Sequence, residues 1–222
     1  MLFRSLAPPT FESDQLNSYE IGYKSETAGG TVAADLALYY VDWDNIQVAA
    51  VRSGFGVRAN ASAASVLGAE AVLTVRPTPN FTSSGALAYQ DAKLAEAAPD
   101  LRARKGERLP NVPRFTAALN ADYMLSIEGL EPAIGVTVRH VSERRASYDA
   151  SVSFPQYRLP DYTSVDLRAS VVLSSVSVQL YANNVFDERG QLSATYRNIV
   201  QVGALPPRTI GVRLYGDRKS VV

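Results

Sequence analysis

The residues best suited to chemistry lie between positions 143 and 158, where arginine and aromatic side chains occur together in one connecting segment. Guanidinium groups pair with oxygen anions and stack on rings. This mixture predicts a site for an aromatic, anionic ligand. An aromatic belt at a membrane surface, combined with ordinary loop charge, has the same composition and remains the alternative. The candidate ligand-binding residues are Arg144, Arg145, Tyr148, Phe154, Tyr157 and Arg158.

A second basic group lies in the longest connecting segment, residues 93–113. Its positive charge could attract an anionic complex or lipid phosphates. The alternative is a solvated loop, because acidic Asp100 and Glu107 lie in the same segment. The basic residues of the group are Arg102, Arg104, Lys105 and Arg108.

Catalytic and metal-binding groups are scarce. The chain has no cysteine and one histidine, His140, so disulfide scaffolds, cysteine nucleophiles and histidine-rich metal sites are excluded. His140, Ser142 and Asp149 lack a nucleophile elbow. Asp42 and Asp44 lack the glycine and the bidentate glutamate of a calcium loop. We therefore expect no enzymatic activity, no metal site and no resident cofactor.

The composition indicates an ordered chain that contains no membrane-spanning helix. The 222 residues include 22 basic and 22 acidic side chains, so the net charge is near zero and general nucleic-acid binding is not expected. Hydrophobic residues make up 46% and charged residues 20%, with a mean hydropathy of −0.06. No segment reaches the roughly 18 consecutive apolar residues of a membrane helix. Residues 1–13 lack the apolar core of a signal peptide.

Alternation of apolar and polar residues with period two recurs along the chain and predicts an all-β fold. Several of the alternating segments exceed the five or six residues usual in globular sheets and match the nine to eleven or so of a membrane-crossing strand. We expect about nine antiparallel strands, at residues 18–26, 31–51, 61–75, 80–92, 114–125, 132–142, 159–172, 176–187 and 208–216.

Short and long connections between these segments alternate strictly. In an antiparallel meander this places every tight turn at one end and every long loop at the other, as in an outer-membrane barrel. A soluble sandwich also alternates apolar and polar faces, so both architectures remain open at this point. The short connections are residues 27–30, 76–79, 126–131 and 174–175, and the long ones are 52–60, 93–113, 143–158 and 188–207.

Several segments, in order and spacing, closely resemble TonB-dependent outer-membrane receptors. The stretch SYEIGYK at 18–24 is followed by LYYVDWDNIQ at 38–47, as in the later part of the family's barrel. YANNVFD at 181–187 looks like the penultimate-strand motif and PRTIGVRL at 207–214 like the closing strand. Gly68-Ala69-Glu70 and LPNVPRF at 109–115 also match, so the resemblance covers about residues 8 to 215.

The resemblance implies a receptor in the outer membrane of a Gram-negative bacterium. Such a receptor binds a scarce nutrient outside the cell, commonly a ferric siderophore, and passes it through the barrel. The inner-membrane TonB complex supplies the energy by acting on a plug domain. Outer-membrane lipid and the barrel assembly machinery are the other expected partners. The fold expected is an antiparallel transmembrane β-barrel meander, part of a plugged barrel of about 22 strands.

The resemblance also divides the chain. Residues 1–17 correspond to an external loop remnant, 18–216 to the carboxy-terminal portion of the barrel, and 217–222 to a tail. Family members usually end in an aromatic residue, whereas Tyr215 is followed by seven more residues. With nine strands, no plug and no signal, we expect a fragment from a split, truncated or misannotated gene. The alternatives are a non-transporting fragment of a decayed or split receptor gene and a soluble β-sandwich binding module.

Overall fold

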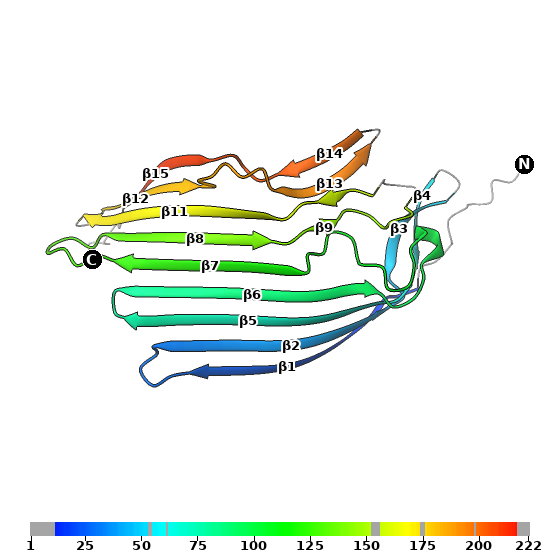
Figure 1. The fold of residues 1–222 in the computed structure, drawn as a ribbon, viewed down its shortest axis with the longest axis horizontal. Coiled ribbons are helices and arrows are strands. Elements are labelled where there is room, and N and C mark those ends of the chain that lie inside the picture. Colours follow the sequence, from blue (N-terminus) through cyan, green and yellow to red (C-terminus); the bar gives the residue numbers. More distant parts are fainter. Residues whose placement is uncertain are drawn as a thin grey trace, which may run out of the picture.

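Strands make up most of the part of the protein that the structure describes. The computed structural model describes residues 12–52, 55–60, 62–151, 156–173, 176–197 and 199–216. Within these ranges nine strands form one antiparallel sheet in which each pairs with its neighbours in chain order (Figure 1). The predicted all-β, nine-stranded meander is confirmed. Its strands are β1 (Gln15–Glu26), β2 (Val32–Asp44), β5 (Ala64–Thr78), β6 (Phe81–Leu94), β7 (Phe115–Met124), β8 (Ala133–Val141), β11 (Tyr162–Leu173), β12 (Val176–Asn183) and β15 (Thr209–Gly216).

The tight turns lie together at one end of the sheet (Figure 1). The β1–β2 turn is possible because Gly29 and Gly30 adopt positive φ angles of 87° and 70°. The predicted turn at residues 76–79 is shorter than expected. β5 continues to Thr78 through a register shift after Val75, where Pro77 needs no ladder hydrogen bond. The predicted turn at 174–175 lies outside the described residues.

The opposite end of the sheet carries the long connections, which are more ordered than the sequence predicts. The segment predicted as one strand over 31–51 is broken at Asn45, whose φ is +53°. The connecting segments contain β3 (Gln47–Arg52), β4 (Phe55–Asn60), the 3-10 helix η1 (Pro99–Leu101), β9 (Arg144–Arg145), β10 (Arg158–Leu159), β13 (Gln191–Arg197) and β14 (Ile199–Ala204). Two of the predicted loops are therefore partly β-hairpins, β3–β4 and β13–β14.

One face of the nine-stranded sheet is apolar along its whole width. The register aligns Ile21, Leu38, Ala69, Tyr89 and Phe115 on successive strands of the first half. A matching row in the second half contains Ala121, Val136, Leu167, Ala182 and Ile210. Ile21 is 72% exposed and Ile210 75% exposed. Such a face requires an apolar surrounding, because each Å² of apolar surface left in water costs about 25 cal/mol.

No second sheet packs on either face in the ranges that the structure describes. The soluble sandwich is therefore wrong, since a sandwich buries one face of each sheet. Among the described residues no helix is long and apolar enough to cross a membrane. The buried hydrophobic residues all belong to the loops or to strand ends beside them: Ile46, Ala64, Ala92, Leu94, Ala98, Ala103 and Leu159.

Candidate functional site

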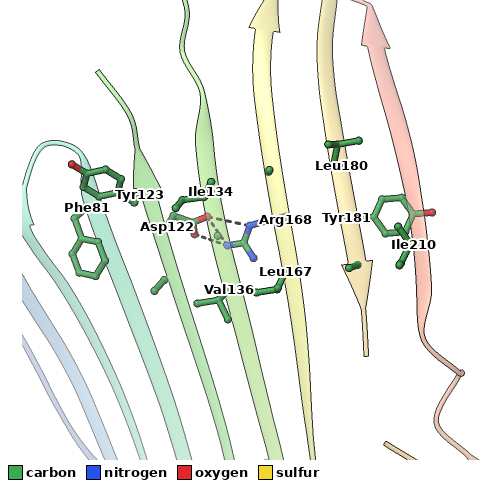
Figure 2. Close-up of a pocket in the computed structure, with 14 residues that line it drawn as sticks. Phe81, Asp122, Tyr123, Ile134, Val136, Leu167, Arg168, Leu180, Tyr181 and Ile210 are labelled. Carbon is green, nitrogen blue, oxygen red and sulfur yellow. Dashed lines mark hydrogen bonds and ion pairs between the residues drawn. The ribbon is translucent and has the colours of Figure 1, made fainter. Parts of the chain in front are cut away.

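The second face of the sheet carries a hydrogen-bonded network that spans β7, β8 and β11. Arg168 on β11 binds Asp122 on β7, with Nη2 2.6 Å from both carboxylate oxygens and Nε 3.1 Å from Oδ1 (Figure 2). Its Nη1 donates to Oγ1 of Thr137 at 2.9 Å, and that hydroxyl donates to Asn120 at 2.8 Å. The network fixes the polar face at its centre.

Gly135 on β8 makes this arrangement possible, because it stands between the two charged partners. A Cβ at position 135 would lie 2.5 Å from Arg168 Nε and 2.5 Å from Asp122 Oδ1. Two other polar-face side chains cross a glycine in the same way: Tyr39 covers Gly68 and Tyr181 covers Gly211. Large side chains therefore lie flat along the polar face of the sheet, over glycines of the neighbouring strands.

A cavity of about 570 Å³ belongs to the opposite, apolar face (Figure 2). Its lining comes chiefly from apolar-face positions, and the charged residues in it, Asp122 and Arg168, already bind each other. The other polar side-chain groups of the lining are the hydroxyls of Tyr123 and Tyr181, so the cavity is predominantly apolar. The apolar part of the lining includes Phe81, Tyr123, Ile134, Leu167, Leu180 and Ile210.

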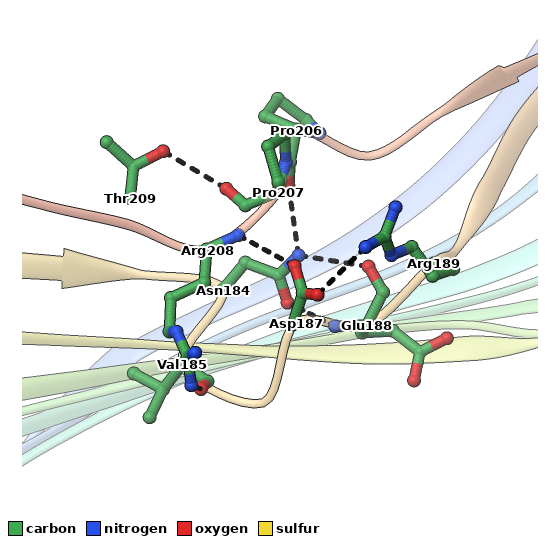
Figure 3. Close-up of polar contacts among 9 residues, drawn as sticks. All are labelled: Asn184, Val185, Asp187, Glu188, Arg189, Pro206, Pro207, Arg208 and Thr209. Carbon is green, nitrogen blue, oxygen red and sulfur yellow. Dashed lines mark hydrogen bonds and ion pairs between the residues drawn. The ribbon is translucent and has the colours of Figure 1, made fainter.

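A compact polar cluster ties together the base of the last long connection, between β12 and β15 (Figure 3). The Asn184 side chain is buried; its Nδ2 donates to the carbonyls of Glu188 and Pro206 at 2.9 Å, and its Oδ1 accepts from the Glu188 amide at 2.8 Å. Asp187 accepts from the Arg208 amide at 3.0 Å. These bonds join the two ends of the connection, so the YANNVFD segment has a structural role here.

Five of the six candidate ligand-binding residues lie in the described structure, and Phe154 lies outside it. Arg144 is only 6% exposed. Its Nη2 donates to the carbonyls of Gln191 and Leu192 at 2.9 and 2.7 Å, so this guanidinium ties β9 to β13. Arg145 and Arg158 are exposed and face each other in the β9–β10 ladder. Arg145 binds Asp149 at 2.6 Å and Arg158 binds Glu143.

The two aromatic candidates that are described are half-buried. Tyr157 uses its carbonyl to accept the Ala146 amide at 2.9 Å. Tyr148 packs against the small loop core of Leu94, Ala98 and Ala103, which belongs to the other predicted basic segment. Burial, with a smaller contribution from the charge of Glu107, raises the pKa of Tyr148 to about 12.

The fold thus brings the two candidate loops into contact. The Asp149 amide donates to Glu107 Oε1 at 2.5 Å, and Glu107 Oε2 accepts from the Arg104 amide at 2.9 Å. Between the loops lies a cavity of about 360 Å³, which we call the loop basin. It is lined by Gly106, Glu107, Arg108, Arg114, Glu143, Arg145, Ser147 and Asp149.

Arg114 and Glu143 were not among the candidates from the sequence. Each is a charged residue at the loop end of a predicted strand, which was the only sequence signal available. Arg108 lies beside Arg114, and burial together with that second cation lowers the pKa of the Arg108 guanidinium. Basic Arg102, Arg104 and Lys105 line an adjoining cavity that shares Glu107 and Asp149 with the loop basin.

In the part of the chain described, no group of three or more His, Cys, Asp or Glu side chains could hold a metal ion. Arginine-rich cavities with paired carboxylates instead suit the binding of charged or polar ligands from solution.

A family model described as the TonB dependent receptor-like β-barrel matches residues 3–185. A curated relative, the metal-pseudopaline receptor CntO of Pseudomonas aeruginosa, is 31% identical over 211 residues. The match covers 94% of this chain and 28% of CntO, so the chain spans less than a third of that relative's length.

Solved structures show the same fold. The ferric yersiniabactin uptake receptor FyuA of Yersinia pestis gives a TM-score of 0.76 at 19% identity, covering 92% of this chain and 30% of FyuA. The copper transporter OprC gives a TM-score of 0.72 at 16% identity, covering 95% of this chain and 33% of OprC. The ferric preacinetobactin receptor BauA of Acinetobacter baumannii gives 0.68 at 16% identity, covering 90% and 29%.

Proposed function

Because the chain belongs to the TonB-dependent receptor family, we propose that it serves in outer-membrane uptake of a metal bound to a small chelator, with a ferric siderophore as the first expectation. Its location is the outer membrane of a Gram-negative bacterium. The observation that carries the proposal is the separation of the apolar face of the sheet from a loop basin at one end of it, lined by three arginines and three carboxylates.

The relatives support a chelated metal as cargo. CntO is named for a metal–pseudopaline complex and FyuA for a ferric complex, whereas OprC is named for copper. All three names include a metal, but they differ in which metal it is. We therefore propose the metal complex as cargo and iron as the metal to test first.

The proposed division of labour follows the structure. Residues 18–216 form the carboxy-terminal portion of the barrel wall, with outer-membrane lipid against the apolar face. Arg145, Tyr157 and Arg158 contribute ligand contacts at the loop end, while Arg144 holds their loop against β13. The TonB complex acts through a plug domain, and the barrel assembly machinery inserts the strands. We propose transport with no enzymatic step.

The test is uptake of radiolabelled iron by the producing bacterium with its gene intact, deleted or restored. Cells receive one ferric siderophore at a time, with and without a functional TonB complex. We expect deletion to abolish uptake of one chelate and loss of TonB to do the same. Uptake of every chelate at the normal rate after deletion would contradict the proposal.

A paired variant tests the proposed contacts. Arg145→Gln combined with Arg158→Gln should raise the half-saturating chelate concentration without lowering the amount of protein in the membrane. Each single variant is also compared with Arg189→Gln, a change of the same charge at an exposed arginine that is ion-paired with Asp187 on another loop. Equal effects of the two changes would argue against ligand contact by Arg145 and Arg158.

A further inference from the structure

We propose that Arg108 and Arg114 form an oxyanion site in the loop basin that binds carboxylate groups of the transported chelate, an inference that rests on the proposed function. The two guanidinium groups come from the last part of one connection, residues 95–114 between β6 and β7. Neither residue belongs to the arginine and aromatic group at 144–158.

The first observation is that both guanidinium groups lack a full set of partners among the described residues. Nη2 of Arg108 donates to the Val112 carbonyl at 3.2 Å, but Nε is buried with no hydrogen-bond partner. Nη2 of Arg114 is 3.9 Å from Asp91, and that carboxylate is bound more closely by Lys93 at 3.1 Å. A buried N–H without an acceptor is destabilising, and a bound oxygen would remove that cost.

The second observation is that the carboxylates of the loop basin are already engaged. Glu107 accepts two backbone amides. Glu143 binds Arg158, and Asp149 binds Arg145 and Gln156. Their hydrogen bonds go to these other groups, so they do not complete the hydrogen bonding of Arg108 or Arg114. Burial and then the charge of Arg114 lower the pKa of Arg108, although Asp91 and Glu143 act in the opposite direction.

The third observation is where Arg114 lies. It directly precedes Phe115, which aligns with Tyr89 on the apolar face, and its carbonyl accepts the Gln90 amide at 2.9 Å. Side chains alternate along a strand, so the backbone position of Arg114 belongs with the polar face, while its guanidinium reaches to 3.9 Å from Asp91. The loop basin is lined by residues of the connections beyond the strand ends, and this position favours a soluble ligand over a lipid phosphate on the apolar side.

The chemistry of the pair selects the ligand. Guanidinium groups bind carboxylates through two parallel N–H···O bonds, whereas a bare divalent cation would be repelled by both arginines. A cavity of about 360 Å³ is large enough for a small polycarboxylate. The class expected is a chelate that keeps carboxylates free at its periphery after it has bound the metal.

The test uses the receptor purified in detergent from the outer membrane of its own producer and titrated with citrate in a calorimeter. Arg108→Gln and Arg114→Gln should each weaken citrate binding about tenfold, roughly 1.4 kcal/mol. Arg114→Lys keeps the charge but loses the fork geometry, so it should fall between. Arg189→Gln should bind citrate as the unaltered protein does.

Heat-modifiable gel migration establishes that each variant is folded, and Arg114→Gln serves if Arg108→Gln does not assemble. Absence of citrate binding, or equal weakening by Arg189→Gln, would overturn the proposal. The proposal would also be overturned if lipopolysaccharide micelles competed with citrate and Arg114→Gln abolished that competition. Citrate binding is measured in purified protein, independently of uptake. If uptake failed while citrate binding still depended on Arg108 and Arg114, only the proposed transport function would be contradicted.

Discussion

The sheet and the loops of this protein are stabilised in different ways. The nine strands bury few side chains, and their apolar face is open along its whole width. The loop end contains the buried hydrophobic residues and much of the side-chain-to-backbone bonding, including that of Arg144 and Asn184. The difference teaches that the sheet depends on its surroundings and its ladder of hydrogen bonds, whereas the loops are held by their own packing.

The largest expected effect is that of a charge placed on the apolar face, which should prevent assembly of the sheet in the membrane. Leu180→Arg puts a cation on a side chain that is 55% exposed on that face. The expected cost is about 2–4 kcal/mol near the bilayer centre. Heat-modifiable migration in outer-membrane fractions measures assembly. Ser170→Arg, on the polar face of β11, is the control, and equal loss in both variants would argue against lipid contact at Leu180.

A substitution at the base of the β12–β15 connection should destabilise that loop without affecting assembly of the sheet. Asn184→Gly removes three side-chain hydrogen bonds while keeping the positive φ of 49° acceptable. The expected local cost is about 2–3 kcal/mol, from three buried bonds. Limited proteolysis should cut residues 188–207 faster while the sheet still assembles. Asn183→Gly, at an exposed neighbouring position, is the control. Unchanged cleavage in the Asn184 variant would show that the polar cluster does not hold the connection.

Two glycines sharpen the contrast between the faces. Gly135→Ala should separate Arg168 from Asp122 and cost about 1–2 kcal/mol, because the new methyl would lie 2.5 Å from both. Gly85→Ala should be tolerated, since the nearest atom, on Leu119, is 3.9 Å away. The urea midpoint for unfolding in detergent measures both. Equal urea midpoints for the two variants would show that the polar face of the sheet tolerates a side chain at position 135.

The smallest effect is a pH dependence confined to the loops. The Tyr148 pKa is raised from 10 to about 12, so the folded loop favours the protonated phenol. Its stabilising contribution is full below pH 10 and is lost as pH rises from about 10 to 12. We expect about 1 kcal/mol, after allowance for partial exposure. Proteolysis of residues 95–114 across this range should accelerate, and Tyr148→Phe should remove the dependence.

The sequence predicts the sheet well because membrane-crossing strands carry their pattern locally. Each strand alternates with period two, so nine strands and their turn order follow from the residues themselves. The β3–β4 hairpin was missed because Asn45 breaks a continuous strand pattern through a single positive φ. The β13–β14 hairpin was missed because residues 188–207 were interpreted only as a loop.

The candidate site was harder to predict, because it depends on which loops meet. Nothing near Arg144 indicates that its guanidinium will bind carbonyls of Gln191 and Leu192, some 47 residues away. The approach of Asp149 to Glu107 likewise spans 42 residues. Charge and aromatic content therefore point to the loop end of the sheet as a hypothesis, but they do not separate the arginine that holds a loop from those that face solvent.

The hydrogen bonds of Asn184 also bear on how freely the last connection can vary. The same side chain joins Glu188 at the start of the connection to Pro206 near its end. The spacing of β12 and β15 is thereby set at the membrane side of the cluster, upstream of the β13–β14 hairpin. We therefore expect insertions within that hairpin to leave the register of β12 and β15 unchanged, which would suit the hairpin to carrying a grafted peptide.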